Sequence, residues 1–411
     1  MININPEIER FTKQYPTEVV IFVGAGASVY FDMPLMKEFF SRYFSNFSIN
    51  SFKNLVLQRP IKGDDVILHC MSTMAEYHID NAIKTKQEDL TVDLEDLIKF
   101  MLDVKNNLAR PTDSNLLTAL NLAITAKYPD LNAKKDSNTF YSENLWRDFV
   151  NEIDTSFKKL TRKLYDVYGR KPDDDLVNKI NETYEPFLKE IAVHNRGGIA
   201  VFTTNYDLCL DVFLKKEKSM YDRPISNGFA RTNADERKHW AINNYYKMTD
   251  APIISYFNLH GSVLWKKVKD GWVYYEPDEG MPEITHDDQV ALEAPVIGKG
   301  TLAICESMYN FYASMLNNNS PKYFITIGYS FRDDILADLT AAHFLRNPNI
   351  KFIYISPTQD HFRLFETNTY KNALLHNPKL KENFIWVQEK FGGLSQTKRI
   401  INKMREKAVW T

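Results

Sequence analysis

Four short motifs carry the residue types that could bind and act on a nucleotide. They are Gly24 to Ser28, Thr203 to Asp207, Leu259 to Gly261 and Gly328 to Phe331. In the first, the missing side chains of a Gly-x-Gly pair let backbone N–H groups approach a pyrophosphate, and Ser28 adds a hydroxyl. An asparagine such as the one in the second motif can orient a ribose hydroxyl or a water. The four motifs together predict a nucleotide site.

The glycine loop departs from the common dinucleotide-binding fingerprint. Gly24 and Gly26 are present, but the third glycine is missing, and no acidic residue closes a second strand at the usual distance for binding a ribose. A Gly-x-Gly pair by itself also occurs in many tight turns. The loop therefore disfavours an ordinary dehydrogenase. It indicates a nucleotide site only in combination with the other three motifs.

Asn205, Asp207 and His260 are the polar residues best suited to chemistry. Asn205 or Asp207 could cap the helix predicted from Leu208 onward, but a cap accounts for only one of them. A histidine that follows an apolar strand is often a packed residue bonded to backbone. Because an ordinary imidazole side chain can exchange a proton near neutral pH, His260 can instead serve as a general base, a role worth on the order of 10² to 10⁴ in rate.

The remaining polar candidates lie toward the C-terminus. Asp333 and Asp334 precede an apolar-periodic segment and are interpreted as helix caps. No histidine or carboxylate accompanies them at a recognisable ligand spacing, so we expect no metal. Ser356 follows another apolar run and is the last candidate to line the site. The three cysteines are isolated from one another and indicate neither a disulfide framework nor a cysteine zinc site.

Each of the four motifs directly follows a short apolar run rich in β-branched residues, which is the pattern of a buried parallel strand. The four runs are Val19 to Val23, Ile199 to Phe202, Ile253 to Phe257 and Tyr323 to Ile327. Similar runs continue at Phe352 and Phe384. In open α/β sheets, ligands bind beyond the carboxyl ends of the strands. The sequence therefore predicts an α/β protein with a Rossmann-like parallel sheet, helices on both faces and the four motifs at one edge.

The pattern changes between the first helix, predicted over Leu35 to Phe44, and the second strand. From residue 51 to 194, strand-like runs are missing, and segments such as Leu94 to Val104 and Leu176 to Val193 carry spaced apolar residues among charges. We therefore expect an all-helical module inserted at 51–194. The Rossmann-like domain is then discontinuous and consists of residues 1–50 and 195–411.

Composition restricts the class of protein. With 411 residues, of which 44% are hydrophobic, the chain is long enough for a sizeable core and a globular fold. A formal net charge of -2 argues against nucleic acid as the default partner. No apolar run approaches the ~20 residues that span a bilayer, and the N-terminus has no basic segment followed by an apolar one. We expect a cytoplasmic protein with no membrane contact.

In these motifs and their order, the Rossmann-like portion resembles the sirtuin (silent information regulator) superfamily, especially its bacterial antiphage-defence branch of NAD-consuming proteins. The resemblance implies that NAD is the substrate. It assigns catalysis to Asn205 and His260, and it places Asn205 and Asp207 near the nicotinamide ribose. The residues that it assigns to the pyrophosphate and the adenosine are Gly24, Ala25, Gly26, Ser28, Gly328, Ser330 and Ser356.

Departures from the deacylating sirtuins bear on the expected reaction. The family's Gly-Ile-Pro-Asp-Phe-Arg loop corresponds to Asp32 to Lys37, which lacks the Phe-Arg pair. The four zinc-binding cysteines that follow the histidine in those sirtuins are missing, and Val268 to Trp272 instead carries a hairpin signal with an Asp-Gly turn. Ser356 replaces a common asparagine. The lost pair and cysteines fit a protein that splits NAD with water.

We therefore expect a hydrolase that takes NAD as substrate and uses no metal. The alternatives are a module that senses NAD or ADP-ribose without cutting it, and a protein deacylase or ADP-ribosyltransferase. By analogy with the resembling defence systems, we expect a homo-oligomer that depletes NAD in antiphage defence. The same analogy suggests a HerA-type ATPase as partner, or alternatively an Argonaute-like protein.

Overall fold

The computed structural model describes part of the chain. The described residues are 6–34, 167–169, 171–195, 197–216, 225–232, 235–241, 244, 254–268, 271–275, 290–292, 303–318, 321–331, 333–347, 349–359, 363–376, 378–407 and 410. The chain divides into two compact units, Met1–Met33 with Tyr165–Thr411, and Pro34–Leu164. The described helices and strands all belong to the first unit.

A seven-stranded parallel sheet forms the centre of this unit, in the order β12-β11-β10-β1-β2-β6-β3. The strands are β1 (Thr17–Val23), β2 (Gly198–Thr203), β3 (Ile225–Ser226), β6 (Ile254–Asn258), β10 (Tyr323–Ile327), β11 (Lys351–Ile355) and β12 (Phe384–Val387). Parallel strands covered on both faces are continuous apolar runs in the sequence, which is why all of these strands except the two-residue β3 were predicted. The predicted α/β, Rossmann-like fold is confirmed.

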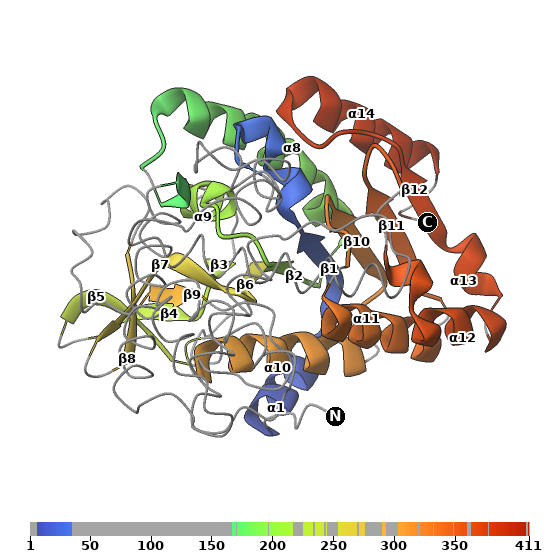
Figure 1. The fold of residues 1–411 in the computed structure, drawn as a ribbon, viewed down its shortest axis with the longest axis horizontal. Helices are drawn as coiled ribbons and strands as arrows, with labels where there is room; N and C mark the ends of the chain where they lie inside the picture. The colour runs from blue at the N-terminus through green and yellow to red at the C-terminus, as the bar shows by residue number, and fades with distance from the viewer. Residues whose placement is uncertain are drawn as a thin grey trace, which may run out of the picture. The chain divides into compact units, whose positions relative to one another are not determined.

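Helices cover both faces of this sheet (Figure 1). The helices are α1 (Pro6–Gln14), α8 (Asp174–His194), α9 (Cys209–Lys216), α10 (Ala303–Asn317), α11 (Asp334–Arg346), α12 (Asn368–His376), α13 (Lys379–Glu382) and α14 (Gly393–Glu406). In Figure 1, α8, α9 and α14 lie on one side of the sheet, and α1, α10 and α11 lie on the other. Three short 3₁₀ segments, η1 (Ala25–Ala27), η2 (Val29–Phe31) and η6 (Arg363–Glu366), complete the described helical elements.

A row of aromatic rings joins the sheet to α10. Phe22, Phe202 and Phe257 are in register on β1, β2 and β6, so their side chains share one face. The ring of Tyr312 on α10 lies 5.7 Å from that of Phe22 and 4.9 Å from that of Phe202. Phe311 packs 5.0 Å from Phe257. These rings are fully buried, so the first, second and third predicted strands are held together by one core.

Helix α8 lies on the opposite face of the sheet and packs there on α9 and α14. The ring centroid of its Tyr184 lies 5.8 Å from that of Phe213 on α9 and 5.2 Å from that of Phe391, which precedes α14. Arg405 of α14 also makes a bidentate ion pair with Glu190. The sequence analysis places residues up to 194 in the inserted module, whereas α8 lies in the same compact unit as the sheet and packs on α9 and α14. The rest of the expected helical module, residues 51–166, lies outside the described residues, as does the first helix predicted over 35–44.

A second, antiparallel sheet contains five strands in the order β4-β5-β8-β7-β9. They are β4 (Phe229–Thr232), β5 (Asp235–Trp240), β7 (Gly261–Val268), β8 (Gly271–Tyr274) and β9 (Val290–Leu292). The hairpin predicted around the Asp-Gly turn is confirmed by the pairing of Val268 with Gly271. The rest of this sheet was not predicted from the sequence. Its strand β7 begins directly after His260, so the sheet starts at one of the four motifs.

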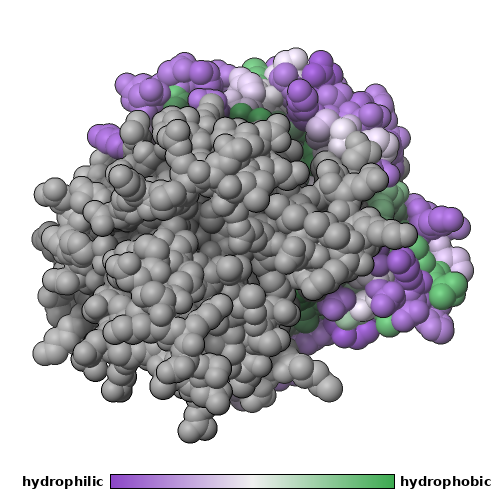
Figure 2. Space-filling view, in the orientation of Figure 1, coloured by the Kyte–Doolittle hydropathy of each residue, from purple (hydrophilic) through white to green (hydrophobic). Residues whose placement is uncertain are grey.

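The visible surface of the C-terminal helices is mainly hydrophilic (Figure 2). This fits the amphipathic sequence of α14, which buries one apolar stripe and leaves its charges outside. Within the described residues, no helix combines the length and the apolar character needed to cross a membrane.

Candidate functional site

The four sequence motifs meet at the carboxyl edge of the parallel sheet. Strand register aligns Val23 with Thr203 and Ile327, and it aligns Thr203 with Asn258. Each motif therefore leaves the sheet at the same level. Strand β1 lies between β2 and β10, so the chain adds β2 and β6 on one side of β1 and later adds β10, β11 and β12 on the other. Such a switch point is where open α/β sheets form their ligand crevices.

The loops after β1 and β10 pack directly against each other through glycines. The Gly26 amide donates to the Gly328 carbonyl at 3.0 Å. A Cβ on Gly24 or Gly26 would lie 2.6 or 2.9 Å from that carbonyl oxygen, and a Cβ on Gly328 would collide with the Ala27 nitrogen. Gly328 also has φ of 59°. The glycines are thus required by contact between the two loops, a reason that the sequence did not reveal.

Asn205 is held in one orientation by the loop after β1. Its Nδ2 donates to the Gly24 carbonyl at 3.1 Å and to Ser28 Oγ at 3.2 Å. Thr203 Oγ1 accepts from the Asn205 amide and donates to the Val23 carbonyl. The Asn205 Oδ1 atom is buried and has no hydrogen-bond partner among the residues that the structure describes. A buried acceptor of this kind costs about 1–3 kcal/mol unless a water or a ligand hydroxyl satisfies it.

Ser28 and Asp207 extend this network into the interior. Ser28 is 1% exposed, and its hydroxyl is engaged with both Asn205 and Asp207. Burial raises the pKa of Asp207, and hydrogen bonds from Ser28 and Cys209 only partly counteract the increase. The sequence predicts that Ser28 contacts a pyrophosphate. In the structure its hydroxyl bonds to Asn205 and Asp207, and the pyrophosphate contact stays a prediction.

His260 lies at the same edge, 2% exposed, two residues after the end of β6. Its Nε2 is 3.1 Å from the Tyr309 hydroxyl and 3.5 Å from Asp333 Oδ2. Its ring is 6.4 Å from that of Tyr206, which connects it to the second motif. The structure therefore brings His260 beside the segment that carries Asn205 and Asp207.

Asp333 serves two elements at once. Its Oδ1 accepts from the Ile335 and Leu336 amides, which confirms the predicted cap of α11. Its Oδ2 accepts from the Tyr309 hydroxyl at 2.9 Å and faces His260. Burial by itself would raise the pKa of Asp333, but the hydrogen bond and charge of His260, with the Leu336 amide and Tyr309, lower it below its ordinary value.

The residues expected near the adenosine are placed mainly by their backbones. The Ser330 carbonyl accepts from the Arg363 amide at 2.9 Å, and the Ser356 carbonyl accepts from Trp386 Nε1 at 3.0 Å. Phe331, between them in sequence, is fully buried with φ of 55°, an uncommon conformation for a bulky residue. Ala25 lies in η1, where its carbonyl accepts from the Ser28 amide. Gly328 and Ser356 also begin their loops side by side, because β10 pairs with β11.

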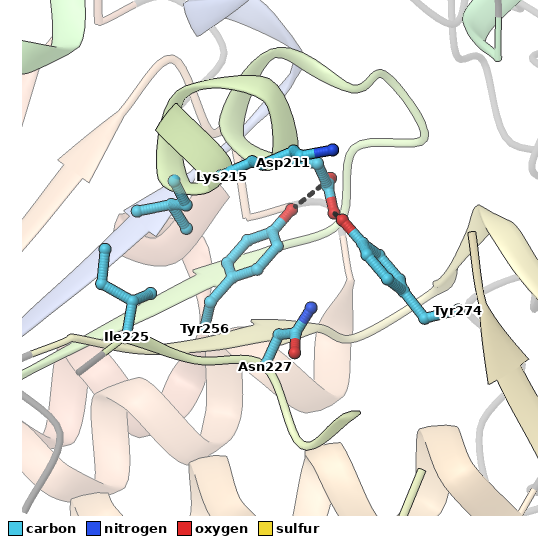
Figure 3. A pocket seen from close by; sticks show the side chains of 7 residues that line it. Asp211, Lys215, Ile225, Asn227, Tyr256 and Tyr274 are labelled. Atoms are coloured by element: carbon cyan, nitrogen blue, oxygen red, sulfur yellow. Dashed lines mark hydrogen bonds between the residues drawn. The ribbon is translucent and has the colours of Figure 1, made fainter. Parts of the chain in front are cut away.

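A separate pocket lies beside α9 and contains none of the predicted site residues (Figure 3). Its space measures about 330 Å³ with the adjoining open solvent included, and it is lined by Asp211, Leu214, Lys215, Ile225, Asn227, Tyr256 and Tyr274. The hydroxyls of Tyr256 and Tyr274 donate to opposite oxygens of Asp211 at 3.0 and 3.3 Å. Burial raises the pKa of Asp211 to about 7, although both tyrosines lower it.

Sequence reasoning missed three polar residues near these sites: Asn258, Tyr309 and Asp211. Asn258 is 3% exposed, and its Oδ1 has no hydrogen-bond partner in the described ranges. Its signal was a polar residue closing an apolar strand immediately before Leu259 and His260. Asp211 was detectable as a charge inside an otherwise apolar helix. Tyr309 gives no local signal, because its importance depends on contacts 24 and 49 residues away in the chain.

The arrangement provides a histidine next to a carboxylate, together with buried asparagine acceptors at the same sheet edge. Such groups can hold ribose hydroxyls, orient a water and exchange a proton. No protein-family model matches the chain, and no curated protein matches it either.

Proposed function

We propose that this chain hydrolyses NAD at the bond between nicotinamide and ribose. Water adds to the anomeric carbon as the bond to the nicotinamide nitrogen breaks, so the products are nicotinamide, ADP-ribose and a proton. The Asn205 side chain carries this proposal. Its amide nitrogen is engaged by the glycine loop, so its buried oxygen is directed by the fold and retains capacity to accept a hydrogen bond.

Each residue role follows from donor and acceptor chemistry. Asn205 Oδ1 accepts a hydrogen from the attacking water or from a ribose hydroxyl. His260 takes a proton from the hydroxyl network as positive charge develops at the anomeric carbon. Gly24, Gly26 and Gly328 hold the two loops that flank the proposed pyrophosphate position. The resemblance to NAD-consuming sirtuins supports the choice of NAD among nucleotides.

The test is nicotinamide release from NAD by the purified chain. We expect His260→Ala and Asn205→Ala to abolish release, because each removes a group assigned to the reacting ribose or water. Far-UV circular dichroism and thermal unfolding should show that both variants remain folded. Exposed residues provide matched controls, His376→Ala on α12 and Asn402→Ala on α14, and these should hydrolyse NAD at the normal rate.

Other outcomes would favour the alternative functions. Binding of NAD without release under any condition, including added partner, would replace hydrolysis with a sensor module for NAD or ADP-ribose. Release that requires an acylated peptide would indicate a deacylase. Normal hydrolysis by either His260→Ala or Asn205→Ala would contradict the residue roles.

The proposed partners rest on the resemblance alone. We propose that the chain forms a homo-oligomer and assembles with a HerA-type ATPase, which would restrain an otherwise toxic activity until infection. An Argonaute-like protein is the alternative partner. Size-exclusion chromatography of the chain with and without the ATPase tests this, since a strict monomer under both conditions would contradict it.

A further inference from the structure

We propose that Asp333 and Tyr309 are positioning residues that fix His260 in the tautomer with its proton on Nε2. The inference rests on the proposed function for its catalytic meaning, because His260 is the proposed proton acceptor. The arrangement itself is independent of any substrate. It consists of His260 after β6, Tyr309 on α10 and Asp333 at the start of α11, so three separate elements converge on one imidazole nitrogen.

The hydrogen-bond inventory decides the tautomer. The Tyr309 hydroxyl has one hydrogen, which it donates to Asp333 Oδ2 at 2.9 Å. Toward His260, the same hydroxyl oxygen can therefore only accept. Asp333 Oδ2, 3.5 Å from Nε2, is also an acceptor. With two acceptors facing Nε2, that nitrogen carries the hydrogen, and Nδ1 carries the lone pair of the neutral ring.

The carboxylate can enforce this choice because it is itself immobilised. Asp333 Oδ1 accepts from the amides of Ile335 and Leu336 at 3.0 and 3.1 Å, so the first turn of α11 sets the direction of Oδ2. The Asp333 side chain is 5% exposed, which shields its charge from water. When His260 takes up a proton on Nδ1, the resulting positive charge lies beside this carboxylate, which stabilises it.

Asp333→Asn is the decisive substitution, since it changes the group facing His260 without removing the cap. The helix amides require an acceptor, so the new carboxamide oxygen takes the place of Oδ1 and its NH₂ group takes the place of Oδ2. A donor then faces Tyr309 and His260. We expect the His260 proton to move to Nδ1, which leaves the general base in the wrong tautomer.

The primary measurement is the tautomer of His260 in the full chain labelled with ¹⁵N-histidine. Two-bond ¹H–¹⁵N correlation spectra distinguish the two tautomers, and the His260→Gln variant identifies the signal among the nine histidines. The wild-type protein, Tyr309→Phe and the control Asp338→Asn should show the proton on Nε2. Asp333→Asn should show it on Nδ1. Asp338 is exposed on the same helix and bonds Thr369, so it reports on loss of a carboxylate away from His260.

Nicotinamide release gives the second readout. We expect Asp333→Asn to lower kcat on the order of 10²-fold or more, with KM changed less than about twofold. Tyr309→Phe should lower kcat by less than about tenfold, because Asp333 Oδ2 still accepts from Nε2–H. Asp338→Asn should leave both constants unchanged. The preserved cap should keep the thermal unfolding of Asp333→Asn close to that of the wild type.

The outcomes separate this proposal from the proposed function. Wild-type His260 protonated on Nδ1, or Asp333→Asn with an unchanged tautomer and normal kcat, would overturn the positioning role. The wild-type spectrum decides the tautomer even if a variant does not fold. The predicted tautomers in a chain that never releases nicotinamide would support the positioning of His260 and refute NAD hydrolysis.

Discussion

Asp211 illustrates at the residue scale how burial changes the behaviour of a carboxyl group. It is 3% exposed, and burial raises its pKa from 3.8 to about 7 against the opposing hydrogen bonds of Tyr256 and Tyr274. The charge of Asp207 raises it further. Because the folded state holds this proton more tightly than the unfolded state, Asp211 contributes stability that is fully present below about pH 4. That contribution is lost as the pH rises to about 7.

Asp211→Asn should remove this pH dependence. The free energy of unfolding of the variant, relative to that of the wild type, should increase between about pH 4 and 7. The slope can reach about 1.4 kcal/mol per pH unit, because one proton is linked to unfolding. Urea unfolding at several pH values measures the difference, with Asp338→Asn as the exposed control. A difference that does not change with pH would contradict the assigned role of burial.

At the element scale, the loops after β1 and β10 behave as one structural unit. Their glycines allow backbone contact, and Tyr329 stacks on Phe22 with ring centroids 4.2 Å apart. The loop after β10 contains two residues at positive φ, Gly328 and Phe331. Phe331 keeps this conformation because its ring is buried and its centroid lies 4.7 Å from that of Tyr329. Any change in one loop should therefore be transmitted to the other.

Gly328→Ala tests this coupling, with Gly271→Ala as the matched control. Both glycines have positive φ, so both substitutions introduce backbone strain, on the order of 1–3 kcal/mol. A Cβ at position 271 has open space, whereas one at 328 collides with the Ala27 backbone. We expect a larger fall in Tm for Gly328→Ala and loss of nicotinamide release in that variant alone. Equal effects of the two substitutions would show that loop contact contributes little.

At the scale of the whole molecule, the first unit depends on segments far apart in the chain. Strand β1 lies in the interior of the sheet and pairs with β2 and β10. The bond from Thr203 to the Val23 carbonyl spans 180 residues, and the bond between Thr12 and Ser314 spans 302. Helix α1 adds Phe11, whose ring lies 5.9 Å from that of Phe311 on α10. The sheet cannot be completed without the N-terminal segment.

Two truncations should therefore differ in kind. Removal of residues 1–23 deletes α1 and the interior strand β1, and we expect no cooperative unfolding transition in that chain. Removal of residues 1–14 deletes only α1, so the chain should fold with a lower Tm because the apolar surface of α10 loses its cover. Circular dichroism during heating measures both. A cooperative transition without β1 would show that the sheet can form from the remaining strands.

Local pattern in the sequence was sufficient to predict every strand of the parallel sheet except β3, and the meeting of the motifs at one edge. The predicted run Tyr323 to Ile327 coincides with β10, because strands buried on both faces are apolar throughout. The cap by Asp333 was also predictable, since a cap and its helix are adjacent in sequence. The Asp-Gly hairpin followed from turn chemistry in the same way.

Tertiary structure alone decided which residues these elements bring together. The apolar stripe of α8 predicts a helix, but it does not predict which elements that helix packs against. Likewise, Asp333 was identified as a cap, while its second oxygen reaches His260 only because α11 begins beside the loop after β6. The tautomer of His260 and the raised pKa of Asp211 depend on partners from separate elements and on burial. Neither property is encoded in local spacing, because both arise from contacts between residues distant in the chain.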